Sequence, residues 1–258
     1  MTMRALVLAA PGRPLELREV HSPEPAPGQA LVEVIACAIC RTDLHVLDGE
    51  LDRPTLPLIP GHQVVGTIGA VGDRVTDRRV GDLVGVPWLG WADGTCRYCT
   101  SGRENLCPDA RFTGYDLDGG YAERLVVDAR FCLPVPRGFE PVAATPLLCA
   151  GAIGYRALRL AGDGGLIGLY GFGNAARLVT QIALHEGRRV FAFTRPGDTE
   201  TQRLAVERGC AWAGDSTERP PEPLDAAILF AAVGELVPLA LAAVVLGGAV
   251  VCAEIHMS

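Results

Sequence analysis

The sequence predicts an α/β protein of two domains: a compact β-barrel over residues 1–150, then an incomplete doubly wound parallel sheet over residues 151–258. The first half carries short apolar runs separated by glycine and proline, which indicates many short strands. The second half alternates strand-like and helix-like segments, the pattern of a parallel sheet covered by helices. A chain of 258 residues is long enough for two such domains.

Five strands are expected in the first half, where turn residues such as Pro27-Gly28 and Asp118-Gly119-Gly120 separate the apolar segments. Many short strands punctuated in this way favour a barrel over a layered α/β sheet. The expected strands are Met3–Ala9, Ala30–Cys37, Val64–Val71, Leu83–Val86 and Tyr121–Val127.

After about Pro141 the sequence becomes rich in alanine and leucine, and helices are expected to alternate with buried strands. The expected helices are Pro141–Leu160, Asn174–Glu186, Thr199–Arg208 and Glu235–Val245. The expected strands are Leu166–Tyr170, Arg189–Thr194, Ala211–Ala213, Leu224–Phe230 and Ala249–Ala253. A complete doubly wound sheet has six strands, so we expect the last helix–strand unit to be missing.

The overall composition, with 49% hydrophobic and 21% charged residues, is that of an ordinary globular protein. A net charge of −7 offers no basic footprint for nucleic acid. No apolar run could cross a bilayer, and the N-terminus has no signal-peptide pattern, so we expect no membrane partner and a cytoplasmic location. Nine cysteines, an odd count without a secretion signal, argue against a disulfide framework.

The segment Cys40–His45, together with His62 and Cys149, has the residue types of an open metal site. Two thiols and one imidazole are ligands that a catalytic zinc uses, and three protein ligands leave the fourth position open. Asp43 is a plausible acceptor for the ring N–H of His62. Taken singly, each residue has a simpler interpretation: a buried cysteine, a surface histidine and an unrelated helix cysteine. The metal site is favoured because Cys40–His45 contains a thiol, a hydroxyl, a carboxylate and an imidazole within six residues.

A second cluster consists of Asp93, Cys96, Cys99 and Cys107. Cysteines separated by two residues in a tight loop point to a common centre, as in structural zinc sites. Three thiolates and one carboxylate would close the tetrahedron and exclude solvent. The alternative is three reduced loop cysteines without metal, because oxygen is a less favoured ligand in closed zinc sites.

The turn Gly171-Phe172-Gly173-Asn174-Ala175-Ala176 matches the dinucleotide-binding pattern G-x-G-x-x-A. It follows an expected strand and opens an expected helix, which is the context that the pattern requires. Gly171 would allow the tight turn, Gly173 the close approach of a pyrophosphate, and Ala176 close helix packing. The helix N-terminus would supply N–H donors to the phosphates. An ordinary glycine turn remains the alternative.

The next strand ends in Thr194-Arg195, where NAD binding calls for an acidic residue about 20 residues after the glycine turn. Arg195 could instead form charge-assisted bonds to a 2′-phosphate, which favours NADP over NAD. A solvated loop arginine is the alternative interpretation.

These motifs resemble the zinc-dependent alcohol dehydrogenases of the medium-chain dehydrogenase/reductase superfamily over essentially the whole chain. The pieces that carry the resemblance are Cys40–His45, Gly61-His62, Gly85–Gly90, Asp93–Cys107, Tyr121-Ala122-Glu123 and Leu148–Gly151. The resemblance implies a GroES-like catalytic barrel and a Rossmann domain. It also implies two zinc ions per chain, NAD or NADP as cofactor, and an alcohol or aldehyde as substrate.

Carried over by position, the resemblance makes Cys40, His62 and Cys149 the catalytic zinc ligands, and the Asp93 cluster the structural zinc site. Thr42 would pass a proton through the cofactor ribose to His45 and solvent. By the same resemblance, Arg41 would contact the cofactor pyrophosphate and Trp88 would line the alcohol pocket.

The sequence departs from the family pattern at Gln63, where glutamate is usual, at Asp93, where cysteine is usual, and at Glu254, where glycine is usual. The expected homo-oligomer would lack the strand that usually forms the dimer. Two other functions therefore stay open: a truncated zinc- and nucleotide-binding protein without turnover, and a zinc-free quinone reductase, which the cysteine and histidine ligands disfavour.

Overall fold

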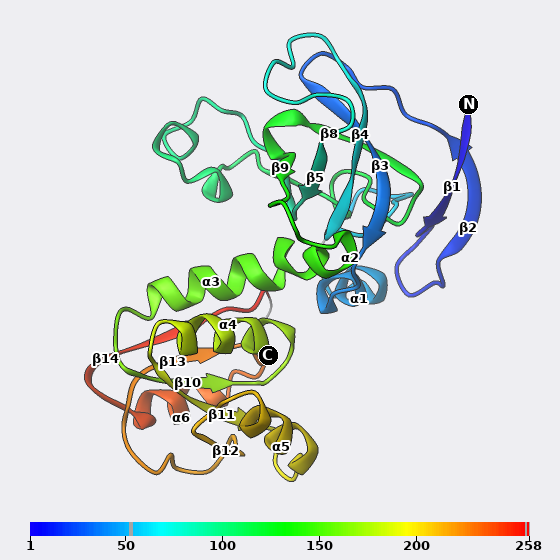
Figure 1. The fold of residues 1–258 in the computed structure, drawn as a ribbon. Helices are drawn as coiled ribbons and strands as arrows, with labels where there is room; N and C mark the ends of the chain where they lie inside the picture. The colour runs from blue at the N-terminus through cyan, green and yellow to red at the C-terminus, as the bar shows by residue number, and fades with distance from the viewer. Residues whose placement is uncertain (52–53, 256, 258) are drawn as a thin grey trace. The chain divides into compact units, whose positions relative to one another are not determined.

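A computed structural model describes residues 1–51, 54–255 and 257. It divides the chain into two compact units, Met1–Cys149 and Ala150–Ser258. Figure 1 shows strands dominating the first unit and an alternation of helices and strands in the second. The strand-rich first half and the parallel sheet of the second half that the sequence predicts are both present, and the strands of the first half pair antiparallel.

The first unit is built on a five-stranded antiparallel sheet with the strand order β8-β3-β4-β5-β9. Its core consists of inward-facing side chains such as Val32, Ile68 and Leu125, each no more than 2% exposed. The strands are β1 (Thr2–Val7), β2 (Glu16–His21), β3 (Gln29–Cys37), β4 (Val64–Val71), β5 (Leu83–Val86), β6 (Leu89–Trp91), β7 (Arg111–Phe112), β8 (Arg124–Asp128) and β9 (Leu133–Pro134). The helices are α1 (Arg41–Asp48), α2 (Pro141–Ala144) and the 3-10 turns η1 (Cys99–Ser101), η2 (Glu104–Leu106), η3 (Ala129–Phe131) and η4 (Thr145–Leu148).

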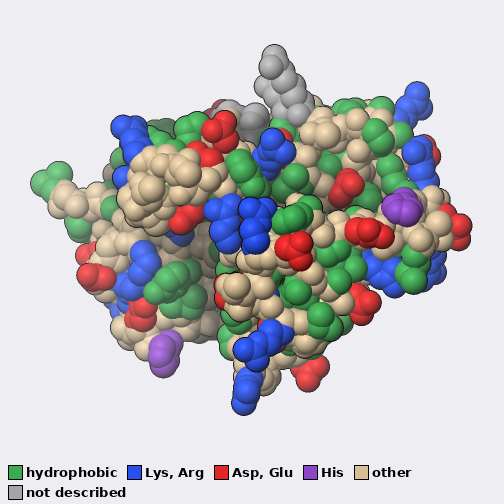
Figure 2. Space-filling model, turned by 90° about the horizontal axis from the view of Figure 1, so that it is seen from above, with side chains coloured by type: hydrophobic (Ala, Val, Ile, Leu, Met, Phe, Trp, Pro, Cys, Tyr) green, Lys and Arg blue, Asp and Glu red, His purple; other side chains and the backbone are tan. Residues whose placement is uncertain are grey.

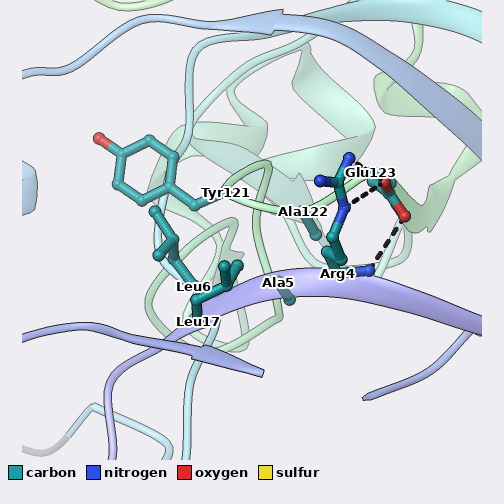
Figure 3. A pocket seen from close by; sticks show the side chains of 7 residues that line it. All are labelled: Arg4, Ala5, Leu6, Leu17, Tyr121, Ala122 and Glu123. Atoms are coloured by element: carbon teal, nitrogen blue, oxygen red, sulfur yellow. Dashed lines mark hydrogen bonds and ion pairs between the residues drawn. The ribbon is translucent and has the colours of Figure 1, made fainter. Parts of the chain in front are cut away.

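The hairpin of β1 and β2 is attached to the rest of the first unit through the segment Tyr121–Glu123. Leu6 donates its backbone N–H to Tyr121 O at 2.8 Å, and Glu123 donates to Arg4 O at 3.1 Å. Figure 3 shows the Arg4 side chain reaching the Glu123 carboxylate, at 2.7 Å, while the Tyr121 ring points away from this ion pair. The hairpin is therefore held by backbone pairing, by one exposed ion pair and by the buried packing of Met3, Ala5 and Val7 against Ile59.

The second unit is a five-stranded parallel sheet with the order β12-β11-β10-β13-β14. Its strands are β10 (Leu166–Tyr170), β11 (Arg189–Thr194), β12 (Trp212–Asp215), β13 (Leu224–Leu229) and β14 (Val244–Cys252). Its helices are α3 (Ala150–Leu160), α4 (Asn174–His185), α5 (Thr199–Glu207) and α6 (Leu236–Ala243).

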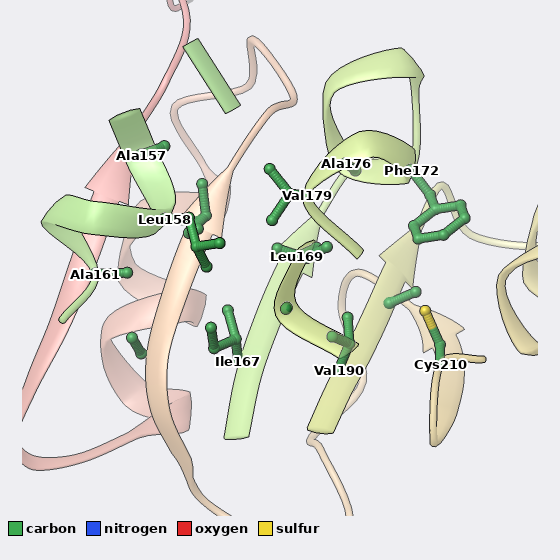
Figure 4. Packing of buried hydrophobic residues seen from close by; sticks show 14 of the residues in the cluster. Ala157, Leu158, Ala161, Ile167, Leu169, Phe172, Ala176, Val179, Val190 and Cys210 are labelled. Atoms are coloured by element: carbon green, nitrogen blue, oxygen red, sulfur yellow. The ribbon is translucent and has the colours of Figure 1, made fainter. Parts of the chain in front are cut away.

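Helices cover both faces of this parallel sheet because the side chains of each strand alternate between the two faces. Ile167 and Leu169 of β10 pack under α3 and α4, as Figure 4 shows. Leu166 and Tyr170 of the same strand belong to the opposite cluster, which contains residues of α6. Both faces are buried, which explains why β10 reads as a continuous apolar run.

The single helix predicted over Pro141–Leu160 is wrong, because it breaks into α2, η4 and α3. Pro146 has no N–H to donate within a helix, and its ring crowds the preceding turn. Cys149, with φ −128° and ψ −72°, lies at the break outside helical geometry. The interruption therefore frees Cys149 from a regular helix.

The structure also differs from the sequence prediction at β2 and at the start of β14. Strand β2 was not expected, because its residues are almost all exposed and give no alternation of apolar and polar side chains. The last strand begins at Val244 rather than Ala249, and its pairing with β13 has a register shift between Leu224 and Ala226. The irregular register explains why a regular pattern was not visible there.

The surface shown in Figure 2 carries acidic and basic side chains interspersed among apolar ones. Among the helices in the described part of the chain, none combines the length and the apolar character needed to span a membrane.

The core of the second unit gives a stability prediction. Leu169 is fully buried, whereas Leu241 on α6 is 57% exposed. We expect Leu169→Ala to lower the free energy of unfolding by about 2–5 kcal/mol, because it removes packed atoms and leaves a cavity. Leu241→Ala, the matched control, should change it by no more than about 0.5 kcal/mol. Urea denaturation followed by circular dichroism measures both, and equal effects would contradict the assigned core.

Candidate metal and cofactor sites

The N-terminus of α1 positions the first cysteine of the expected open site. Cys40 is the N-cap residue of α1 with extended backbone geometry, and its N–H donates to Asp43 Oδ2 at 2.7 Å. This reciprocal arrangement of a cap residue and an acidic residue three positions later fixes the start of a helix. The positive end of the helix dipole also favours a thiolate at Cys40.

His62 reaches the same place from the loop before β4. The preceding Gly61 has φ +97°, and a Cβ there would lie 2.6 Å from Tyr121 Cδ1 and 2.9 Å from Cys37 Sγ. Only glycine fits this tight turn without moving its neighbours. The His62 ring is 1% exposed, and its Nδ1 lies 3.0 Å from Asp43 Oδ1.

The other ring nitrogen of His62 is the main sign of a missing partner. Nε2 is buried and makes no hydrogen bond with any group that the structure describes. A buried polar atom without a partner costs free energy, so such atoms are rare in folded proteins. A metal ion would satisfy Nε2 while Asp43 fixes the ring orientation.

Cys149 brings the third donor, at the break between η4 and α3. Its Sγ lies 3.9 Å from Cys40 Sγ, and the donor atoms of Cys40, His62 and Cys149 all lie within 4.8 Å of one another. Two thiolates about 2.3 Å from a tetrahedral zinc stand about 3.8 Å apart. The donor types and their spacing therefore fit zinc with three protein ligands.

The pKa values of Cys40 and of the neighbouring Cys37 shift in opposite directions. A hydrogen bond from Cys149 lowers the pKa of Cys40 to about 4, against the effect of burial. Burial raises the pKa of Cys37 to about 12, so that thiol stays protonated. Burial opposes the charged form of His62, yet the neighbouring Asp43 carboxylate and the charge of Cys40 raise its pKa to about 9. Metal binding would therefore displace a proton from His62.

The second cluster also comes together. Asp93, Cys96, Cys99 and Cys107 each place a donor atom within 4.8 Å of the others. Asp93 Oδ1 accepts the N–H groups of Cys96 at 2.8 Å and Thr95 at 2.6 Å. These two bonds hold the pKa of Asp93 well below its usual range, so the carboxylate is charged and fixed. The set fits a closed zinc site of three thiolates and one carboxylate oxygen.

A cluster of aromatic residues lies on one side of the His62 ring. Trp88 meets it edge to face, with ring centroids 5.0 Å apart, and stacks on Phe112 at 5.1 Å. Tyr115 lies 5.8 Å from Trp88. Sequence reasoning selected Trp88 but missed Phe112 and Tyr115; their only signal was a pair of aromatic residues just before the Asp118 turn.

The residues expected to move a proton occupy different environments. Thr42 Oγ1 lies 3.7 Å from Cys40 Sγ, and Arg41 is exposed in the first turn of α1. His45, expected on the proton path towards solvent, is only 5% exposed. Its Nδ1 contacts a carboxylate oxygen of Glu50, a residue that sequence reasoning missed.

The glycine turn lies between β10 and α4. Gly171 has φ +90°, and a Cβ at Gly173 would meet no other atom within 4 Å, so the space beside Gly173 is open. Asn174 begins α4 and is exposed, whereas Ala176 is buried. The Phe172 ring is also buried, in the cluster of Figure 4, so only its backbone is placed to face a cofactor.

Thr194, the last residue of β11, and Arg195, which follows it, have different environments. Thr194 is 3% exposed, and its hydroxyl accepts a hydrogen bond from Gln202 Nε2 at 3.1 Å. Arg195 is exposed at the carboxyl end of the strand. Of the two, Arg195 is the side chain placed to meet a ligand.

Two residues that depart from the family pattern, Gln63 and Glu254, lie at described positions in the structure. Gln63 is 3% exposed, and its amide donates to Ala38 O at 3.4 Å. Glu254 is half-buried just beyond the end of β14. A neutral amide thus replaces a carboxylate directly beside His62.

Comparison with known proteins places these sites in a family. Residues 26–137 match the alcohol dehydrogenase GroES-like domain. The chain is 46% identical over 270 residues to a Mycobacterium tuberculosis (strain CDC 1551 / Oshkosh) protein named as an alcohol dehydrogenase, AdhA, with 100% of this chain and 77% of the relative covered. It is 38% identical over 222 residues to an alcohol dehydrogenase of Geobacillus stearothermophilus, with 85% of this chain and 65% of the relative covered.

A solved structure has the same fold as this chain. A zinc-binding dehydrogenase from Sinorhizobium meliloti 1021, bound to NADP, superposes with a TM-score of 0.89 at 30% identity, covering 99% of this chain and 78% of that one. The chain thus spans 65–78% of the lengths of these three proteins. Both the expected fold class and the expected resemblance are confirmed. The chain belongs to the zinc-dependent alcohol dehydrogenases of the medium-chain dehydrogenase/reductase superfamily.

Proposed function

We propose that the chain oxidises primary or secondary alcohols reversibly to aldehydes or ketones, with zinc and NADP or NAD. The observation that carries the proposal is the buried Nε2 of His62, which makes no hydrogen bond with a described residue and lies beside two cysteine thiols. When bound, zinc supplies Lewis acidity that makes an alcohol hydroxyl more acidic, and the nicotinamide accepts the hydride.

In this proposal, each residue of the first unit has a distinct task. Cys40, His62 and Cys149 hold the metal, and Asp43 orients the His62 ring through the bond to Nδ1. The Trp88 ring, which contacts the His62 ring, limits the space beside it and keeps water out. Thr42, near Cys40 Sγ, accepts the alcohol proton and passes it towards His45.

We assign the cofactor to the second unit, with the pyrophosphate at the Gly171 turn and the N-terminus of α4. The first unit would then be the catalytic domain and the second the dinucleotide-binding domain. The nine free cysteines suit a reducing compartment, and we therefore propose the cytoplasm as the location.

Removing a ligand tests the catalytic metal site. Cys40→Ser and His62→Ala should each lower kcat/KM by more than about a hundredfold, because changes in groups that merely support metal ligands already cost about 10–100-fold. Each should also leave one zinc per chain in place of two. Cys37→Ala, which removes a neighbouring thiol outside the cluster, should keep both. Elemental analysis and a panel of short alcohols give the readouts; full activity in His62→Ala would refute the ligand set.

Stepwise chelation tests the Asp93 cluster. Its four donors lie within fifteen residues, from Asp93 to Cys107, whereas the open site draws on three distant segments. We expect the Asp93 cluster to keep its zinc longer, although carboxylate is a harder ligand than thiolate. Mass spectrometry after alkylation should show Cys40 and Cys149 modified first. Earlier alkylation of Cys96 and Cys99 would reverse the expected order.

Arg195 gives a prediction about cofactor choice. Arg195→Ala should weaken NADPH binding by about tenfold or more, because charge-assisted hydrogen bonds contribute roughly 1.5–3 kcal/mol. NADH binding should change little, since NADH lacks the 2′-phosphate. Arg208→Ala, at the far end of α5, is the matched control. Dissociation constants from fluorescence titration decide it, and a wild-type preference for NADH would refute the choice of NADP.

A further inference from the structure

We propose that Gln202 is a positioning residue for Arg195, and that it acts through the Asp215 carboxylate to favour a cofactor that carries a 2′-phosphate. The proposal rests on the proposed function for the identity of the ligand, whereas the contacts that carry it are independent of that function. Neither the sequence motifs nor the family match assigns a role to Gln202 or Asp215.

The first step of the argument is the tight turn that carries Arg195. The segment Arg195–Asp198 joins β11 to α5, and the Asp198 N–H donates to Arg195 O at 3.0 Å. Pro196 is second in this turn, and Gly197, with φ +79°, is third. Proline followed by a glycine of positive φ is the pattern of a type II turn. These residues therefore determine the backbone from which the exposed Arg195 side chain projects.

The second step is the attachment of this turn to the edge of the parallel sheet. Asp215 is the last residue of β12 and lies opposite Thr194, the last residue of β11, in the parallel register. The Asp215 Oδ1 atom accepts the Gly197 N–H at 3.0 Å. The turn is therefore anchored to the neighbouring strand by a hydrogen bond to a charged group, which is stronger than a bond between neutral groups.

The third step is the place of Gln202. This residue is half-buried on α5, the helix that packs against β11 and β12 (Figure 1). Its Nε2 donates to Asp215 Oδ1 at 2.7 Å and to Thr194 Oγ1 at 3.1 Å, which uses both N–H bonds of the amide. One side chain thus joins the ends of two strands and, through Asp215, the turn that carries Arg195.

The fourth step is the charge around Arg195. Asp198 and Asp215 are the two carboxylates of this network, and each is held by other donors. The oxygens of Asp198 accept from Thr201, from its N–H at 3.0 Å and from its hydroxyl at 2.9 Å. Asp215 Oδ1 accepts from Gln202. Because these carboxylates are held in place, the Arg195 guanidinium stays available to a ligand phosphate. Without Gln202, the Asp215 carboxylate could turn to Arg195 and compete with that phosphate.

Removing the amide tests this arrangement. Gln202→Ala should weaken NADPH binding by about three- to tenfold, the size of the net contribution of a hydrogen bond. NADH binding should stay nearly unchanged, because NADH has no 2′-phosphate. Alanine is a strong helix former, so α5 should persist. Gln181→Ala is the matched control: its amide, on α4, donates to Arg177 O at 3.2 Å, and its loss should leave both dissociation constants unchanged.

Asp215→Asn separates positioning from charge. Asparagine keeps an acceptor oxygen for Gly197 and Gln202 but removes the charge that could compete with a phosphate. We expect NADPH to bind at least as tightly as it does to wild type. If Asp215 instead bound the cofactor ribose directly, as the acidic residue of NAD-binding proteins does, this variant would lose affinity for NADH, and that result overturns the proposal.

A double substitution tests the link to Arg195. In an Arg195→Ala background, Gln202→Ala should have no further effect on NADPH binding, because the two residues act on the same phosphate contact. Fluorescence titration of the full chain measures all of these dissociation constants. Additive losses, equal losses of NADPH and NADH affinity, or a wild-type preference for NADH would each contradict the proposal.

A second readout requires no cofactor. Hydrogen–deuterium exchange measured by NMR should be slow at the Gly197 amide in wild type, in Asp215→Asn and in Gln181→Ala. In Gln202→Ala it should be several-fold faster, because Asp215 is then no longer held against the turn. A wild type that binds neither NADPH nor NADH but shows this pattern supports the positioning role and refutes the proposed function. Equal exchange rates in wild type and Gln202→Ala overturn the positioning role.

Discussion

The Asp43 carboxylate connects two of the three chain segments that form the open metal site. One oxygen accepts the Cys40 N–H at the start of α1, and the other lies 3.0 Å from His62 Nδ1. At 3% exposure, Asp43 makes both contacts out of water, where hydrogen bonds to a charge are strong. Loss of this carboxylate would release the helix start and the histidine ring together.

The remaining features of the site depend on this connection. The left-handed Gly61, which lies against Tyr121, turns the chain before His62, and the break at Pro146 lets Cys149 leave helical geometry beside Cys40. None of the three ligands lies in the middle of a regular helix or strand. A site made from element ends can be specified locally by one glycine, one proline and one buried acid.

Sequence reasoning succeeded where chemistry is encoded in short, local patterns. The cysteine spacing of the second cluster and the glycine turn before α4 each follow from a few neighbouring residues. Strand β10 was also predictable, because burial on both faces gives a continuous apolar run.

The misses have physical causes as well. Strand β2 has no buried face, and the stacking of Phe112 on Trp88 depends on tertiary structure. The burial of His45 follows from packing around α1, and its contact with Glu50 from the left-handed turn at Gly49. The break near Pro146 could have been predicted, since proline inside a helical pattern is a direct signal.

The central claim is that two zinc sites with different donors exist in one chain. Zinc X-ray absorption spectroscopy of the loaded protein tests it most directly, because sulfur and light ligands scatter differently. We predict two zinc ions that share five sulfur ligands, from Cys40, Cys149, Cys96, Cys99 and Cys107, with a histidine signal from His62. A single zinc with three sulfur ligands and no histidine signal would contradict the account.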